Sequence, residues 1–272
     1  MNTTKESPHG TNRKTTTGVG SLLRQNQSQQ GKKMNTNNKT ARIAGFLYLI
    51  YIIVSIFADV FGRSKLIVLG DAATTARNIM ASAWQFRIGF VCDLVAAVLF
   101  LLTAWALYVL LKTVNKNLAM LFLLLNLGGV AVWCASDLFL IASQLLLSGS
   151  DYLKVFQADQ LRALAMLSLY IYKYGFLGIA QVFFGAWLFP LGYLVFKSGF
   201  LPRILGVILM VHCVVWLMNV LQFFLFPGFI GITFVGITYL SYPMGFIAEF
   251  GLALWLLIMG AKDPKPASIE VG

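Results

Sequence analysis

Six long apolar blocks, separated by short polar connections, dominate the chain. They cover residues 43–61, 88–111, 118–147, 164–196, 204–226 and 240–259. Crossing the hydrocarbon core of a bilayer, about 30 Å thick, takes about 20 apolar residues in a helix. Each block meets that length. The pattern therefore predicts an all-α fold, an integral membrane bundle of six transmembrane helices.

The longer blocks and the last connection add detail to this prediction. The third and fourth blocks exceed the length needed, so these helices must tilt or project beyond the lipid. Pro190 is expected to kink the fourth, because proline interrupts helical hydrogen bonding. The Gly-rich, β-branched stretch 228–238 before the last block fits an ordered outer loop, a re-entrant piece or the projecting first turns of the last helix.

Two outer connections are expected to carry short interfacial helices. Asp71 is a good helix N-cap residue. After it, Ala76, Ile79, Met80 and Ala83 recur with the spacing of one helical face. A similar start follows Ser150, which predicts a second such helix before Arg162. For both segments, the favoured interpretation is a connector between spans that carries a surface helix and has no further role.

Polar segments flank the membrane domain. Residues 1–40 are rich in Asn, Gln, Thr, Ser and Lys, a composition typical of a disordered tail. Residues 41–262 form the predicted membrane domain, and 263–272 a short C-terminal tail. One hypothesis places the true start at Met34; an N-terminal peptide of purified protein that begins at Met1 would contradict it.

The distribution of Lys and Arg predicts the orientation. Ten of these residues lie near span ends on one side and six, including Arg63, on the other. Because positive residues are enriched in cytoplasmic connections, the larger set is assigned to the cytoplasm. An even number of spans then places both termini there.

Composition excludes several function classes. The chain is 58% hydrophobic and 11% charged, far from the roughly 25% charged residues of soluble domains. Its net charge of +11 lies mainly in the tail and connections, which indicates anionic lipid rather than nucleic acid as the partner. The three cysteines lie inside apolar blocks, and His9 and His212 occupy very different settings. No metal or other cofactor is therefore expected.

Several motifs in order resemble a bacterial family of multi-pass membrane proteins, domain of unknown function 4386. They are Arg42-Ile-Ala-Gly45, Leu66-Ile-Val68 with Gly70-Asp-Ala72, Phe86-Arg87, Asp93-Leu94, the run from Gly192 to Gly206, Ala248-Glu249 and Leu254-Trp-Leu-Leu257. The resemblance covers roughly residues 41–262. It implies a bacterial cytoplasmic membrane location, and the family has no established activity.

Ionisable and polar residues inside the spans are the candidate functional residues. They are Glu249, Asp137, Asp93, Lys173, Asp59, Tyr174, Gln181 and Asn219. A charge at mid-membrane costs about 2.5–3.5 kcal/mol on insertion scales, so such groups usually face a bundle interior. Their depths and helical phases predict convergence in the outer half of the membrane, around a polar cavity open to the outside. Polar side chains there bind ligands or carry protons.

A simpler interpretation is that the polar groups hydrogen-bond helix to helix. It is favoured for Gln181 and Asn219, as for Asn126, Gln144 and His212. Glu249 and Asp137 fit it less well, because a carboxylate at that depth must be protonated, paired or solvated. Lys173 alone cannot neutralise four acids.

Three functions remain open. The leading one is a carrier or receptor that binds a small polar or cationic solute. The second is an intramembrane enzyme on a lipid-like substrate, although GxSxG, HExxH and P-loop motifs are missing from the sequence. The third is a structural subunit that binds a protein partner. The sequence does not indicate the oligomeric state.

Overall fold

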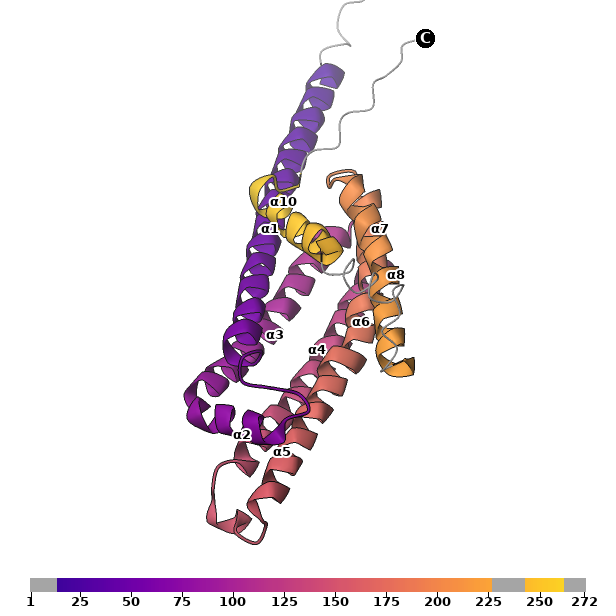
Figure 1. Cartoon of the computed structure of the whole chain (residues 1–272). Helices are drawn as coiled ribbons and strands as arrows, with labels where there is room; N and C mark the ends of the chain where they lie inside the picture. The colour runs from indigo at the N-terminus through magenta and orange to yellow at the C-terminus, as the bar shows by residue number, and fades with distance from the viewer. Residues whose placement is uncertain (1–13, 227–242, 262–272) are drawn as a thin grey trace, which may run out of the picture.

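The computed structural model describes residues 14–226 and 243–261, with side chains from residue 36 onward. These residues form helices and contain no strand (Figure 1). Five helices are long and apolar enough to cross a membrane: Thr36–Gly62, Ala83–Leu111, Lys116–Leu146, Ala158–Lys197 and Arg203–Leu225. The predicted all-α membrane fold is confirmed at this level, with five long spans among the described residues, and the count of six stays a prediction.

The helical elements from α1 to α8 follow one another with connections of at most nine residues. In order they are α1 (Lys14–Gly62), α2 (Ala72–Ala81), α3 (Ala83–Leu111), α4 (Lys116–Leu146), η1 (Asp151–Leu153), α5 (Ala158–Lys173), η2 (Tyr174–Ala180), α6 (Gln181–Ala186), α7 (Leu188–Lys197), α8 (Arg203–Leu225), η3 (Phe246–Phe250) and α10 (Gly251–Ile258). Large aliphatic and aromatic side chains remain exposed along the spans, such as Ile53, Leu124 and Leu221. Hydrocarbon is the solvent that such surfaces fit.

Helix α1 begins at Lys14, so residues 14–40 differ from the predicted disordered tail. A helix already formed in the membrane span is extended without a new nucleation step. The Leu, Arg, Gln and Lys residues in this segment have high helix propensity. Residues 1–13 and 262–272, which include the predicted C-terminal tail, lie outside the described residues.

The fourth span is an uninterrupted series of helical segments from Ala158 to Lys197. Its 40 residues would measure about 60 Å as one straight α-helix, twice the hydrocarbon thickness. The segment Tyr174–Ala180 is π-helical. A second irregularity separates α6, which ends at Ala186, from α7. Pro190 lacks the N–H that would bond to the Ala186 carbonyl, which accounts for this boundary, and the predicted kink stays a prediction.

The last described helix lies obliquely between α8 and α1 (Figure 1). The apolar stretch Pro243–Ile258 would measure about 24 Å, less than a full crossing. The predicted segment 228–241 lies outside the described residues. Beyond α10, the backbone N–H of Ala261 donates a hydrogen bond to the Asn38 side chain, at 3.1 Å. The end of the last helix is thus beside the start of the first span.

The first outer connection has the predicted interfacial helix, α2. Asp71 caps it by accepting a hydrogen bond from the Thr74 N–H at 2.8 Å, and Thr75, Ala76 and Ile79 are its buried residues. The hydrogen bonds from the Thr74 side chain and backbone lower the pKa of the Asp71 carboxyl. The predicted capped helix is therefore confirmed here.

The prediction of a second interfacial helix between Ser150 and Arg162 is wrong. The structure has only the short 3₁₀ turn η1 there, followed by the start of α5 at Ala158. Gln157 and Gln160 form a reciprocal capping box at that start. The cap begins the fourth span six residues before the apolar block at Leu164, which takes up the residues expected to form a separate helix.

An aromatic core joins α1, α3, α4 and the fourth span. Phe100 lies at its centre, with its ring 5.0 Å from Trp187 and 4.2 Å from Tyr51. Tyr48 and Phe122 are fully buried beside Trp187. This core fills the middle of the bundle and lies between the two polar regions described next.

Candidate functional site

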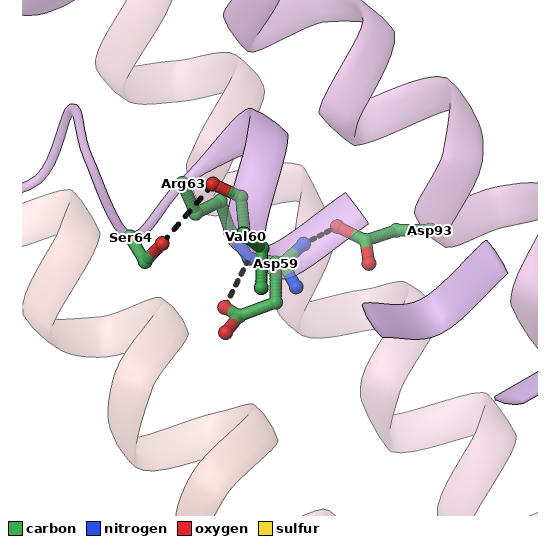
Figure 2. Close-up of polar contacts among 5 residues, drawn as sticks. All are labelled: Asp59, Val60, Arg63, Ser64 and Asp93. Carbon is green, nitrogen blue, oxygen red and sulfur yellow. Dashed lines mark hydrogen bonds and ion pairs between the residues drawn. The ribbon is translucent and has the colours of Figure 1, made fainter. Parts of the chain in front are cut away.

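Arg63 is the centre of an ion-pair cluster at the end of α1 (Figure 2). Its guanidinium pairs with the Asp93 carboxylate of α3, and its Nε lies 3.5 Å from Oδ1 of Asp59. The guanidinium carbon also lies 5.8 Å from the centre of the Tyr172 ring of α5. Asp93 is fully buried and Arg63 is only 6% exposed. With Asp137, these residues are called the Arg63 cluster below.

The position of Arg63 follows from a close crossing of α1 and α3. A Cβ atom on Gly62 would overlap the backbone of Gly89, so the two helices touch at these glycines. Asp93 lies one helical turn after Gly89 and therefore on the same face of α3. Arg63 follows Gly62 directly, which brings its side chain to Asp93.

Asp137 completes the cluster from α4. Its side chain is 1% exposed, and it interacts electrostatically with Arg63. The indole of Trp133, one turn earlier on α4, faces the carboxyl group without reaching hydrogen-bond geometry. Within the described part of the chain, both carboxyl oxygens of Asp137 lack a hydrogen-bond partner.

A second polar region surrounds Glu249 in the last helix. Oε2 of Glu249 accepts a hydrogen bond from the Tyr48 hydroxyl of α1 at 2.5 Å. Oε1 lies 4.0 Å from Nδ1 of His212 on α8, and the Glu249 side chain is 25% exposed. A Cβ on Gly245 would meet the His212 ring at 2.8 Å, so this glycine makes room for the imidazole. Tyr48, His212 and Glu249 are called the Glu249 site.

Polar contacts extend from the Glu249 site to the fourth span. The His212 ring lies 5.2 Å from the Trp216 ring, edge to face. Trp216 donates its indole N–H to Oε1 of Gln181, and Gln181 donates to the Phe176 carbonyl, both at 3.2 Å. A π-helical segment, η2, precedes Gln181, and another, η3, contains Glu249. Such segments occur often at functional sites.

The two regions are separate: Asp59, Asp93 and Asp137 gather at Arg63, whereas Glu249 does not join them. Tyr48 lies in α1, and Arg63 directly follows the end of that helix. The two are fifteen residues apart, which corresponds to about 22 Å at helical rise. Glu249 therefore lies in the half where α1 enters the bundle, with Asp59 and Asp93 at the other end. The prediction assigned depths from the apolar block boundaries, whereas the hydrogen bond to Tyr48 relates Glu249 directly to a position on α1.

The remaining candidates lie outside both regions. Nζ of Lys173 lies 5.8 Å from the Phe223 ring on α8. The exposed Tyr174 lines an apolar groove with residues of α4 and α5, among them Ser136 and Tyr170. Asn219 is half-buried on α8. Their proposed ligand-binding roles stay predictions.

Arg63 is the member of the cluster that the sequence analysis missed. It was counted among the connection residues that set orientation, so four acids were weighed against Lys173 alone. Two features of the sequence indicate a buried arginine: a glycine directly before Arg63, and Gly89 one helical turn before Asp93.

Comparison with known proteins places these residues in a family. Residues 43–260 match the family described as domain of unknown function (DUF4386). The chain belongs to this family. Both the Arg63 cluster and the Glu249 site lie within the matched segment of this DUF4386 protein, and the predicted resemblance is confirmed.

One relative of the DUF4386 protein is an uncharacterised protein of the archaeon Archaeoglobus fulgidus. The two are 27% identical over 159 residues, which cover 58% of this chain and 75% of the relative. No solved structure matches the chain. The bacterial cytoplasmic membrane location stays a prediction, because the relative is archaeal and names no compartment.

Proposed function

We propose that this DUF4386 protein crosses a cytoplasmic membrane six times, with both termini inside, and binds a small polar or cationic solute at Glu249 as a carrier or receptor. The hydrogen bond between Ala261 and Asn38 supports the even number of crossings. An odd number would leave the chain ends on opposite faces of the bilayer. The five long spans therefore need a sixth passage, and the apolar stretch Pro243–Ile258 belongs to it.

The observation that carries solute binding is the Glu249 carboxyl, which belongs to a half-buried side chain and is hydrogen-bonded to Tyr48. A quarter of its side chain is exposed, and its ion-pair partner is a histidine. Among the described residues, the lysine and arginine ion pairs involve Asp59, Asp93, Asp151 and Asp159 rather than Glu249. A carboxylate without a permanent cationic partner favours a positively charged ligand.

Aromatic side chains beside Glu249 suit the same class of ligand. Tyr48 contacts the carboxyl directly, and the Tyr51 ring lies 6.1 Å from that of Tyr48. Ammonium groups are recognised by carboxylates together with aromatic faces, with about 0.5–2 kcal/mol from each favourable cation–π contact. Primary and quaternary ammonium compounds are therefore the first solutes to test.

This site differs from the outward-facing cavity expected from the sequence. The Arg63 cluster lies at the outer end in the predicted orientation, and there Arg63 compensates acidic charge. Glu249 lies nearer the cytoplasmic entry of α1. The solute site is accordingly proposed in the inner half of the bundle.

A ligand-stability screen tests the proposal. Purified full-length protein in detergent is heated with a panel of primary ammonium, quaternary ammonium and guanidinium compounds. A compound at 100 times its Kd is expected to stabilise the wild type by about 2.7 kcal/mol. The Glu249→Gln variant is expected to keep its fold and lose that gain, since the amide keeps the shape of the side chain without its charge.

The two alternative functions would give different results in membranes that contain the overexpressed protein. An intramembrane enzyme would change the composition of a lipid pool when overexpressed, and the change would disappear in Glu249→Gln. A structural subunit would show neither ligand stabilisation nor lipid conversion. Stabilisation that is equal in the wild type and in Glu249→Gln would contradict solute binding at Glu249.

A further inference from the structure

The Arg63 cluster contains more carboxyl groups than its guanidinium can satisfy. Asp59 and Asp93 occupy the ion pairs of Arg63. Asp59 is 61% exposed and is therefore solvated by water at the end of the span, whereas the Asp93 side chain is 1% exposed. Asp137 is a third carboxyl, and Arg63 interacts with it without making a direct ion pair in this arrangement.

The surroundings of Asp137 leave its carboxyl without a stabilising donor. Arg63 from the end of α1 and Tyr172 from α5 interact with it, and Arg63 connects it to Asp59 and to Asp93 of α3. From α4 itself come the Trp133 indole and the Cys134 thiol. Both Asp137 oxygens are buried and lack a hydrogen-bond partner among the described residues.

A buried carboxylate in such a setting is costly unless it is paired and hydrogen-bonded. The neutral acid avoids this cost. The two buried carboxyls, Asp93 and Asp137, together with one arginine and one proton, form a unit with no net charge. The geometry thus pairs the positive charge of Arg63 with the Asp93 carboxylate and leaves the proton for Asp137.

We propose that Asp137 is a proton-binding site in the membrane domain, opposite the Arg63–Asp93 ion pair. On release, the O–H bond of the Asp137 acid breaks and its electron pair stays on the carboxylate. The proton passes to water at the exposed Asp59 end of the cluster. Arg63 then lies between two buried carboxylates and is drawn from Asp59 and Asp93 toward Asp137. The site does not depend on solute binding at Glu249.

Infrared spectroscopy of the full-length protein in lipid nanodiscs tests the site. At neutral pH the wild type should show a C=O stretch of a protonated carboxylic acid, and raising the pH should remove it. The band should be missing in Asp137→Asn. It should persist in Glu249→Gln, which serves as the matched control because it removes another acid inside the bundle. The same spectrum in Asp137→Asn as in the wild type would overturn the proposal.

Thermal unfolding provides an independent readout. Asparagine mimics a neutral acid, so Asp137→Asn should change Tm at neutral pH by less than about 2 °C, whereas Asp93→Asn should lower it by more than about 6 °C. Equal losses in both variants would mean that Asp137 is a charged structural partner and would overturn the proposal. If Asp137→Asn does not fold, Asp137→Glu replaces it: a shift of the carboxylic acid band supports the site, and an unchanged band contradicts it.

Discussion

Replacing Asp93 with asparagine is expected to destabilise the folded bundle by about 3–5 kcal/mol. Arg63 would stay buried at the crossing of α1 and α3 while losing the carboxylate that compensates its charge. Asp59 does not replace that partner, because it is mostly exposed and pairs with Arg63 only through a 3.5 Å contact. Unfolding in a denaturing detergent series measures the difference in free energy.

Asp59→Asn is the matched control for this prediction. It removes a carboxylate from the same arginine, but at an exposed position, where an ion pair contributes about 0–1 kcal/mol. A loss in Asp59→Asn as large as in Asp93→Asn would show that the buried pair does not support the fold. Little loss in either variant would mean that water reaches Arg63.

Gly45→Val is expected to separate α10 from α1 and to cost about 1–3 kcal/mol of stability. A Cβ atom at Gly45 would lie 2.7 Å from the Ala253 carbonyl oxygen and would overlap the Leu257 backbone nitrogen. Backbone atoms cannot move aside as a flexible side chain can. Because Tyr48 is one turn away from Gly45 on α1 and hydrogen-bonds Glu249, any solute-dependent stabilisation should fall with the folding stability.

Gly251→Ala provides the control on the facing helix. A Cβ atom there meets a Leu205 methyl group at 3.5 Å, an ordinary contact. Alanine also has the higher helix propensity, by about 1 kcal/mol in a helix interior. This variant should therefore melt at or above the temperature of the wild type. A Gly45→Val protein as stable as Gly251→Ala would contradict the close packing of α1 and α10.

The sequence predicted the membrane helices because their determinants are local. Apolar length decides whether a segment crosses a bilayer, and the N-cap at Asp71 decides where α2 begins. The segment after Ser150 was harder to predict, because a three-residue turn and the cap at Gln157 have the same polar composition as an interfacial helix. The number of crossings was harder to predict, because the Gly-rich sequence 228–238 fits several conformations.

The site was predicted less well, because depth and pairing depend on tertiary contacts. Asp93 and Asp137 were recognised as buried acids from their positions in apolar blocks. Their partner Arg63 was not, because an arginine just after a span is usually exposed to water. Only the Gly62–Gly89 crossing buries it. The contact of Glu249 with Tyr48 joins residues 201 positions apart, a distance over which helical periodicity carries no information.

The division of the acids into two regions changes how they are expected to work. At the end of α1, Arg63 compensates charge at a buried junction of helices, and Asp137 adds an exchangeable proton. At Glu249, a tyrosine hydroxyl and a histidine ring lie beside a half-buried carboxyl side chain. One group can therefore carry a proton while the other binds a solute, without the two sharing a cavity.

An experimental structure of the full-length protein in lipid nanodiscs tests the separation of these two regions most directly. The structure should show the Arg63 guanidinium against Asp93, and the Glu249 carboxyl against Tyr48, in opposite halves of the bilayer and about 22 Å apart along α1. Density that places Glu249 beside Asp137, with Arg63 in the head-group water, would contradict the account.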